Sequence, residues 1–237
     1  MLGGMENSTI TLGAAAFAPA GSFCGGAHLA NSQTDRLGAF RLRYACYIAE
    51  QRKPYPDANH DNQMLSDELD ADGEIILVKE GGAVSGTVRA NWFDSHATHF
   101  SYASTFELAR FSAINPSEIA VCSRLAVSPE HRDARTRELL FNAIYERGAA
   151  RNTKLCFVAC ATRLVRLFRR YGFREYQTPY EDAVVGRLHR LVLVMRDRAH
   201  LARCNSPFSR IASELDLPDE SQPWLTNIID SHRAIVR

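Results

Sequence analysis

The amino-acid sequence predicts an α/β fold with a mixed central sheet, helices on its faces and a helical extension at the C-terminus. Apolar residues recur at helical spacing in several segments, and short runs of β-branched and apolar residues lie between them. The order helix, antiparallel strands, strand, helix, strand, helix, strand pair places a crossover helix between two strands. With 237 residues, of which 46% are hydrophobic and 23% charged, the chain fits one globular domain with extensions, or at most two small domains.

The N-terminal part begins without periodicity. Residues 1–32 are rich in Gly, Ala and Ser and are predicted to be a flexible arm, because they show no apolar period. Their apolar run contains proline and is too short to span a bilayer. A helix is expected from Thr34 to just before "KPYPDANHD", with one apolar stripe formed by Leu37, Phe40, Tyr44, Tyr47 and Ile48. Residues 74–80 and 83–92, joined by Gly81 and Gly82, predict a β-hairpin.

The following elements alternate between helix and strand. A short helix is expected around residues 106–111, and Gly172 is expected to end the last helix of the core. The spacing predicts strands over 118–127 and 154–160, helices over 133–151 and 162–171, a closing antiparallel pair within 173–176 and 187–197, and a helical tail over 200–237. No internal repeat is present in the sequence.

Charge and cysteine content exclude several function classes. The formal net charge is +1, and the basic residues lack interleaved aromatic residues, so nucleic-acid binding is not expected. Residues 121–196 nevertheless contain fifteen Lys or Arg against seven Asp or Glu, which favours an acidic partner for this region. The six cysteines form no CxxC pair and no ligand spacing with histidine, so we expect buried thiols, no metal and a cytoplasmic location.

The stretch "CSRLAVSPEHRDARTRELL" leads from a predicted strand directly into a predicted helix. The first N–H groups of such a helix are unpaired, and the helix dipole favours an anion there. Arg132, Arg135 and Arg137 add positive charge to the same turn. A pyrophosphate or a phosphopantetheine group would fit this turn, and a solvated basic turn without a ligand is the alternative.

Two arginines occupy positions where burial is expected. Arg43 lies on the apolar stripe of the first helix, and Arg124 alternates with small apolar residues in a strand. Asp67 and Asp70, spaced three apart, could each receive an arginine if they share one helical turn. A ligand-binding cluster and a purely structural ion network both remain open at this point.

The segments "SRLAVSPEHRDARTRELLFNAIYERGAA", "KLCFVAC" and "LFRRYGFREY" resemble the GNAT superfamily of N-acyltransferases. The resemblance covers residues 33–197, leaves residues 198–237 as a C-terminal extension, and implies a GNAT-like sheet that grips the pantetheine arm of an acyl thioester. The chain departs from the usual pattern at Arg135 and Arg137, where glycine or alanine is common, and at Phe168, where acetyltransferases place a tyrosine acid.

A narrower resemblance is to the long-chain N-acyl amino acid synthases and, more distantly, to the acyl-homoserine-lactone synthases. It rests on Arg43 with Tyr47, Asp67 with Asp70, Arg89, and the pair Ser123-Arg124, all in the expected order. The lactone synthases also place a tryptophan after the first helix and an acidic residue at the position of Val121, and this chain has neither. The resemblance therefore implies an amino acid acceptor rather than S-adenosylmethionine.

The expected reaction moves a medium or long fatty acyl group from acyl carrier protein, or from acyl-coenzyme A, to the α-amine of an amino acid. No cofactor is expected to be bound permanently, and membrane contact is expected at most through the product. We assign catalytic roles to Arg124, to Glu107 or a water as the base, and to a backbone N–H near Ala126 or Val127. The substrate pocket is assigned to Arg43, Tyr47, Asp67, Asp70, Arg89 and Ser123, and the acyl donor to Leu125, Arg132, Arg135, Thr136, Arg137 and Phe168.

Three alternative functions remain. The chain could be an acyl-homoserine-lactone synthase, an acetyl-coenzyme A-dependent N-acetyltransferase, or a module that binds acyl thioesters without catalysis. The first two differ from our hypothesis in acceptor and donor. The third would show no turnover to lose when Arg124 is replaced.

Overall fold

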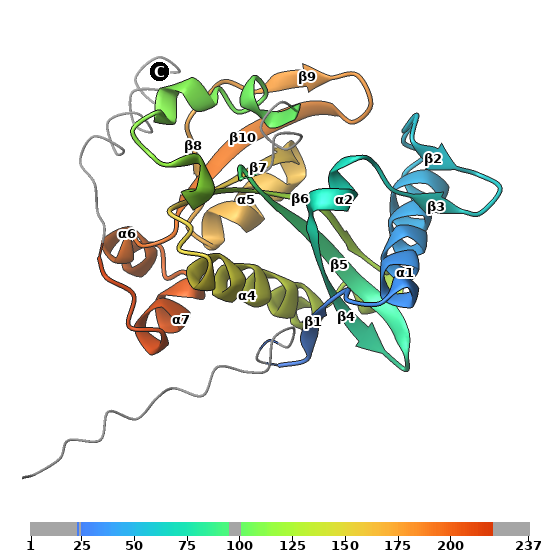
Figure 1. Ribbon diagram of the computed structural model, residues 1–237, viewed down its shortest axis with the longest axis horizontal. Helices are drawn as coiled ribbons and strands as arrows, with labels where there is room; N and C mark the ends of the chain where they lie inside the picture. Colours follow the sequence, from blue (N-terminus) through green and yellow to red (C-terminus); the bar gives the residue numbers. More distant parts are fainter. Residues whose placement is uncertain (1–22, 24, 95–100, 220–237) are drawn as a thin grey trace, which may run out of the picture.

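A computed structural model describes residues 23, 25–94 and 101–219. Its centre is an eight-stranded sheet in the order β1, β4, β5, β6, β7, β10, β8, with β9 also paired to β10 (Figure 1). The strands are β1 (Ala27–Leu29), β4 (Glu74–Glu80), β5 (Ala83–Trp92), β6 (Ile119–Val127), β7 (Leu155–Ala161), β8 (Arg174–Glu175), β9 (Tyr180–Asp182) and β10 (Gly186–Val194). A separate pair joins β2 (Ala58–Asn59) to β3 (Met64–Leu65).

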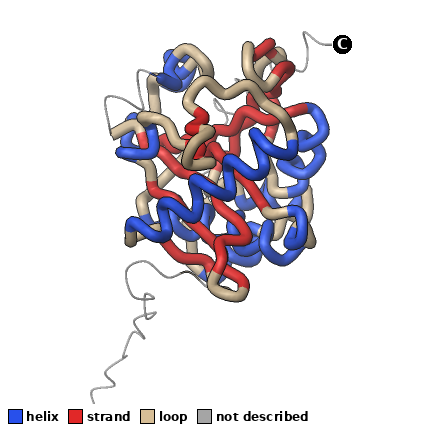
Figure 2. Tube along the Cα trace, turned by 90° about the vertical axis from the view of Figure 1, so that its right-hand side faces the viewer, coloured by secondary structure: helices blue, strands red, loops and turns tan. Residues whose placement is uncertain are grey.

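Helices cover both faces of the sheet. They are α1 (Gln33–Tyr44), the π-helix η1 (Ala45–Glu50), α2 (Leu69–Asp72), α4 (Ala134–Ala150), α5 (Thr162–Arg170), α6 (Arg198–Arg203) and α7 (Phe208–Glu214), with short 3₁₀ turns η2 (Leu108–Phe111), η3 (Pro116–Glu118) and η4 (Pro129–His131). In β4, Ile75 and Leu77 pack with α1, whereas Ile76 and Val78 pack with α4. Since successive side chains in a strand alternate between faces, α1 and α4 lie on opposite sides. Figure 2 shows α1 crossing in front of the strands.

The C-terminal helices belong to the largest core cluster. Leu201 of α6 and Phe208 of α7 are buried with side chains from α4, α5 and β10. This agrees with the predicted helical extension as far as the described residues reach, and the remainder of the predicted tail, 220–237, lies outside them. Within the described ranges, no helix is both long and apolar enough to cross a lipid bilayer.

Local sequence signals explain several element boundaries. The Ser32 hydroxyl accepts a hydrogen bond from the Asp35 N–H at the start of α1, and the Asp133 carboxylate accepts one from the Thr136 N–H at the start of α4. Gly81 and Gly82 both have positive φ, as the tight turn of the predicted β4–β5 hairpin requires. Gly172, with φ +99°, follows the end of α5 as predicted.

Two predicted boundaries were wrong. The predicted flexible arm of residues 1–32 reaches too far, because Ala27–Leu29 forms β1 and pairs with Ile76–Val78 of β4. This strand is too short for a periodicity signal, and its pairing partner lies about fifty residues away along the chain. The first helix was predicted as one uniform element, but after Tyr44 it widens into the π-helix η1. The other core elements begin and end close to the predicted residues.

Strands β6 and β7 separate from each other after a short parallel contact. They pair only at Ile119–Val121 with Leu155–Phe157, although both strands continue further. The register between β5 and β6 also shifts between Thr87 and Arg89, where Arg124 adopts a left-handed φ of 55°. A bulge of this kind bends the strand and redirects a side chain. The sheet is therefore open between β6 and β7.

Candidate functional site

A cavity of about 480 Å³ fills the opening between β6 and β7. Both strands contribute to its wall, with residues 122–125 of β6 and residues 158–161 of β7. The polar mouth is lined by Lys53, Tyr55, Asp57, Asp67, Arg89 and Arg124. The closed end is lined by the buried residues Tyr145, Phe173, Leu193, Met195 and Phe208. The cavity therefore changes from charged to apolar along its length.

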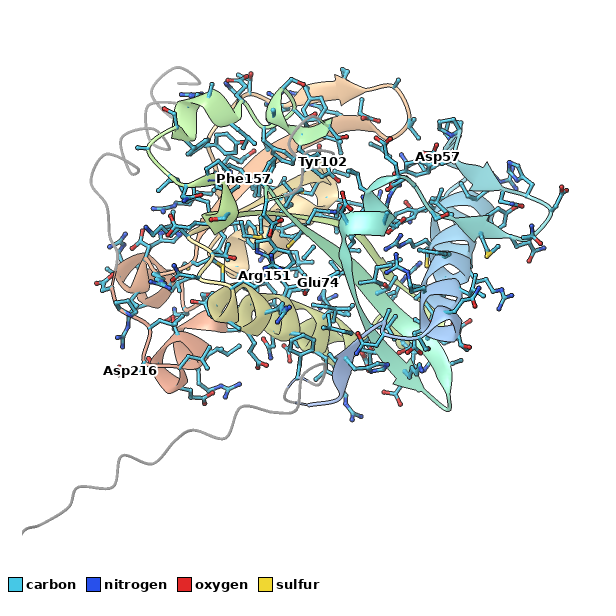
Figure 3. All side chains as sticks on the ribbon, in the orientation of Figure 1. Asp57, Glu74, Tyr102, Arg151, Phe157 and Asp216 are labelled. Atoms are coloured by element: carbon cyan, nitrogen blue, oxygen red, sulfur yellow. The ribbon has the colours of Figure 1, made fainter. Side chains whose placement is uncertain are left out.

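The mouth lies between segments that are distant in sequence. Asp57 and Tyr102, both cavity-lining residues labelled in Figure 3, lie on the same side of the molecule, above α4 in that view. Lys53 donates a hydrogen bond of 2.8 Å to the carbonyl of Val185, which links the segment after η1 to the turn between β9 and β10. Both residues line the cavity, so this bond forms part of its rim.

Asp67 is the centre of the charged cluster at the mouth. Its Oδ2 accepts a hydrogen bond of 3.0 Å from the Arg124 Nε, and its Oδ1 forms an ion pair with Arg89. The Leu69 N–H also donates to Oδ1 at 3.0 Å. Burial alone would raise the pKa of Asp67, but the charges of Arg89 and Arg124 lower it below its usual value. Asp67 is therefore ionised at neutral pH.

Asp70 extends the same cluster into the core. Its Oδ1 lies 2.7 Å from the Arg43 Nη1 and 3.0 Å from the Arg89 Nη1, while its Oδ2 accepts the Asp67 N–H at 2.9 Å. Arg43 is fully buried, and its burial lowers its pKa despite the adjacent carboxylate of Asp70. Three arginines and two aspartates leave this cluster with one excess positive charge. The structure thus brings together the predicted residues Arg43, Asp67, Asp70, Arg89 and Arg124.

Further predicted pocket residues lie beside the cluster. The Arg89 Nε donates to the Ser123 hydroxyl at 3.1 Å, and its Nη2 donates to the Tyr102 hydroxyl at 3.3 Å. The guanidinium carbon of Arg124 lies 4.6 Å from the centre of the Tyr55 ring, in a cation–π contact. These contacts fix the orientation of Arg89 and Arg124 at the mouth.

The π-helix positions Tyr47 over the open edge of β6. The Tyr47 hydroxyl donates a hydrogen bond of 2.5 Å to the carbonyl of Leu125, and burial raises its pKa well above the usual value. Single π-helical turns recur at functional sites because the extra residue per turn shifts the following side chains. Tyr47 lines the cavity, whereas Arg43, one turn earlier, does not.

The geometry at the end of β6 corrects the expected backbone donors. The Leu125 carbonyl accepts from Tyr47 and the Val127 carbonyl accepts from the Arg132 Nε at 3.3 Å, whereas the Ser128 N–H donates to Ser85 on the β5 side. Because backbone groups alternate between the two edges of a strand, the amides of Leu125 and Val127 face the open edge. The Ala126 amide faces β5, so Ala126 was wrong as a donor. Only Leu125 of these residues lines the cavity.

The basic turn before α4 is not part of the cavity wall. The Arg132 Nη1 lies 2.6 Å from the Glu50 Oε1, and Asp133 occupies the helix start through its bond to the Thr136 N–H. Arg135 is exposed, and neither it nor Arg137 lines the cavity. Of the predicted donor-binding residues, the cavity wall contains Leu125 and Phe168.

Glu107, the predicted base, lies away from the cavity. It accepts a hydrogen bond of 2.6 Å from the Gln177 Nε2 and lies 3.7 Å from the Arg110 Nη1. It is absent from the cavity wall, and a base must reach the proton that it accepts, so nothing in this geometry supports Glu107, and its role as the base stays a prediction. Its place just before the turn η2 depends on a tertiary contact with Gln177, which no local sequence signal indicates.

Several residues at the site were missed by the sequence interpretation. Tyr55, Asp57 and Lys53 lie in the proline-bounded "KPYPDANHD", where charged and aromatic side chains in a loop could have indicated a binding segment. Tyr102 follows an irregular stretch, and Tyr145 and Phe208 resemble ordinary core residues. For the last two, the sequence contains no signal that separates a cavity wall from a packed core.

A protein-family model matches the part of the chain that carries the charged cluster. The model for N-acyl amino acid synthase FeeM matches residues 38–194, about two thirds of the chain, and this range contains the whole charged cluster. The chain belongs to this family. It is therefore an acyltransferase, and the predicted resemblance to N-acyl amino acid synthases is confirmed. Among curated protein sequences, none matches the chain.

Solved structures confirm the GNAT-like fold of this FeeM family member. The FeeM N-acyl amino acid synthase from uncultured soil microbes superposes with a TM-score of 0.56 at 13% identity, covering 71% of this chain and 94% of that chain. The CoA-dependent acyl-homoserine lactone synthase BjaI gives 0.58 at 18% identity, over 74% and 84%. The acyl-homoserine lactone synthase LasI gives 0.55 at 15%, over 71% and 89%.

Proposed function

We propose that this acyltransferase moves a medium or long fatty acyl group from an acyl carrier protein thioester to the α-amine of an amino acid. The observation that supports this best is a single cavity with a charged mouth and a buried apolar end. Apolar walls stabilise hydrocarbon, whereas a few placed polar groups orient the reacting end. An acetyl group would use almost none of the apolar end. The cytoplasmic location expected from the cysteine pattern stays part of this proposal.

The N-terminus of α4 favours acyl carrier protein over coenzyme A as the acyl donor. A pyrophosphate would need the free N–H groups and positive charge of this turn. Here the Asp133 carboxylate already accepts the Thr136 N–H, and Glu50 pairs with Arg132. A second anion would meet the negative charge of Asp133 at the same place. BjaI, which shares the fold, is CoA-dependent, so the fold by itself does not select the donor.

The arginines of α5 provide a docking surface for an acidic carrier protein. Arg163, Arg166, Arg169 and Arg170 are exposed on this helix, and Arg163 lines the cavity. A partner bound here would have its pantetheine arm next to the opening between β6 and β7. Since exposed charges at an interface mainly accelerate association, the use of this donor should fall as salt is raised.

The excess positive charge at the mouth supports an amino acid acceptor. Arg124 is bonded to Asp67, but the cluster as a whole has one arginine more than it has carboxylates. We assign the acceptor carboxylate to Arg124, which lines the cavity and whose guanidinium packs on the Tyr55 ring. This contact would place the α-amine beside the thioester carbon.

The chemistry needs a proton acceptor for the α-amine. Asp67 is bonded to two arginines, and Asp182 accepts the N–H groups of Val184 and Val185 at 2.9 Å. Asp57 lines the same mouth, and within the described ranges it has no hydrogen-bond or ion-pair partner. We therefore assign to Asp57 the proton that the ammonium group loses before attack.

The amine then attacks the thioester carbonyl. The developing oxyanion is assigned to the Leu125 amide on the open edge of β6, where a preorganised N–H donor stabilises charge. This attack forms the C–N bond, and collapse of the tetrahedral intermediate then breaks the C–S bond while the nitrogen loses its second proton. The pantetheine sulfur leaves as a thiolate that takes up a proton, and the N-acyl amino acid is released.

The experiment is mass spectrometry of lipid extracts from a bacterium that expresses this chain, with an Arg124→Ala variant as control. The proposal predicts new N-acyl amino acids that the variant does not produce. Acyl-homoserine lactones would instead indicate a lactone synthase. If the folded protein gave no acylated product, and purified protein also failed with loaded acyl carrier protein, the proposal would be wrong.

A further inference from the structure

We infer that the C-terminal helix α7 closes the acyl-binding end of the cavity and that Phe208 sets the longest acyl chain that the protein uses. This inference rests on the proposed function, because it assigns the apolar end to the fatty acyl group. It concerns a segment outside the FeeM family match, which ends at residue 194. Phe208 is thus a length-determining residue supplied by the extension.

The closed end is aromatic and fully buried. Phe208 and Tyr145 both line the cavity and are at most 1% exposed. Their rings stack with centroids 4.3 Å apart and an interplanar angle of 19°. Since the exposed residues Pro56 and Asp57 line the other end, an acyl chain that enters at the mouth has its terminal methyl group near this pair.

The position of Phe208 is fixed by contacts to the core. The Ser206 hydroxyl accepts the Phe208 N–H at 3.2 Å and donates to the Tyr171 carbonyl at 2.8 Å. The Tyr145 hydroxyl donates to the Met195 carbonyl at 2.5 Å, which holds the second ring of the stack. Because these bonds anchor both rings, the end wall can move little to admit a longer chain.

The physical consequence is a sharp limit on chain length. Each methylene group buried in the apolar end strengthens binding, so chains that fill it are preferred to shorter ones. A chain that is too long must push its excess methylene groups into the charged mouth or displace the stacked rings. One surplus methylene in a filled apolar pocket changes selectivity by roughly 10- to 200-fold.

The test uses full-length protein and a mixture of acyl carrier proteins loaded with decanoyl, dodecanoyl, tetradecanoyl and hexadecanoyl groups. Products are quantified by mass spectrometry for wild type, Phe208→Leu and Phe208→Trp. Phe111→Leu is the matched control, because Phe111 is also fully buried but does not line the cavity. Circular dichroism and thermal unfolding select the variants that fold.

We expect Phe208→Leu to raise use of the next longer donor by at least about 10-fold relative to the preferred one, since the end wall retreats. Phe208→Trp should shift use toward shorter donors, and Phe111→Leu should leave the distribution unchanged. A folded Phe208→Leu protein with the wild-type distribution would overturn the inference, as would an equal shift in Phe111→Leu.

A binding measurement separates this inference from the proposed function. S-alkyl pantetheine thioethers of graded length cannot react, so calorimetry reports only the fit of the chain. If the wild type binds them with a length preference that Phe208→Leu extends, the inference stands even when no acyl transfer is found. If acyl transfer occurs but this preference is the same in both proteins, the proposed function stands and the inference fails.

Discussion

The two ends of the cavity are built by different means. At the mouth, charged side chains from β5, β6 and the segment around Asp67 are fixed by short, directional contacts, such as the 3.0 Å bond between Arg124 and Asp67, and the same cluster continues into the core to Arg43 of α1. At the closed end, rings from α4 and α7 are fixed mainly by stacking and burial. Orientation of a reacting group needs directional bonds, whereas selection of a hydrocarbon needs only shape. We therefore expect the mouth to control the acyl-transfer reaction and the closed end to control selectivity for the length of the acyl chain.

The largest expected effect concerns Asp70 in the buried part of the charged cluster. Asp70→Asn should lower the free energy of unfolding by about 3–5 kcal/mol, because it leaves the fully buried Arg43 without its carboxylate partner. Urea unfolding followed by circular dichroism measures this. Asp72→Asn on the same helix is the control, since Asp72 is exposed and should change little. A small loss in Asp70→Asn would mean that the cluster does not stabilise the fold.

The next prediction concerns Arg124, which lines the cavity at its mouth. Arg124→Ala should reduce kcat/KM by about 100-fold through misplacement of the acceptor, while the protein stays folded. The matched control is Arg187→Ala, because Arg187 is exposed, and this variant should keep wild-type turnover. The decisive readout is KM for the amino acid, which should rise in Arg124→Ala. A fall in kcat alone with unchanged KM would contradict a role in acceptor binding.

The third prediction concerns the helix start next to the mouth. Asp133→Asn keeps a side chain that can cap α4 but removes its negative charge. Use of acyl-coenzyme A should therefore rise by about two- to five-fold, and use of acyl carrier protein should stay unchanged. Competition between the two donors at low salt measures the ratio. An unchanged ratio would show that Asp133 has no part in donor choice.

The smallest expected effect is a change in pH dependence. The pKa of Asp67 is lowered in the folded state by Arg89 and Arg124, so its contribution to stability is complete above its unfolded pKa of about 3.9. It is lost as the pH falls through the lowered folded value. Asp67→Asn should thus flatten the dependence of the urea midpoint on pH below about 5. Parallel curves for the two proteins would contradict this.

The mouth could be predicted from the sequence because its residues violate ordinary patterns. An arginine on an apolar stripe, such as Arg43, or in a buried strand, such as Arg124, needs a carboxylate, and two aspartates at helical spacing supply it. Each of these side chains conflicts with its local environment, and such conflicts mark functional sites. Most of the strands and helices were predictable as well, since their apolar periods are regular.

The closed end could not be predicted, since nothing in its sequence departs from a normal core. Tyr145 and Phe208 obey the same apolar period whether their rings face a packed neighbour or a cavity. The side chain of Glu107 accepts a hydrogen bond from Gln177, which is seventy residues away along the chain. The strand β1 was missed for the same reason, because its pairing with β4 is a long-range contact. Local patterns do not contain this information.

The most direct test of the central claim uses purified full-length protein, dodecanoyl-loaded acyl carrier protein and a mixture of the twenty amino acids. Release of the carrier thiol and formation of N-acyl amino acids are measured together, for wild type and for Arg124→Ala. We expect one equivalent of N-dodecanoyl amino acid for each thiol released by the wild type, and almost none from the variant. Thiol release without acylated amino acid, or equal product from both proteins, would contradict it.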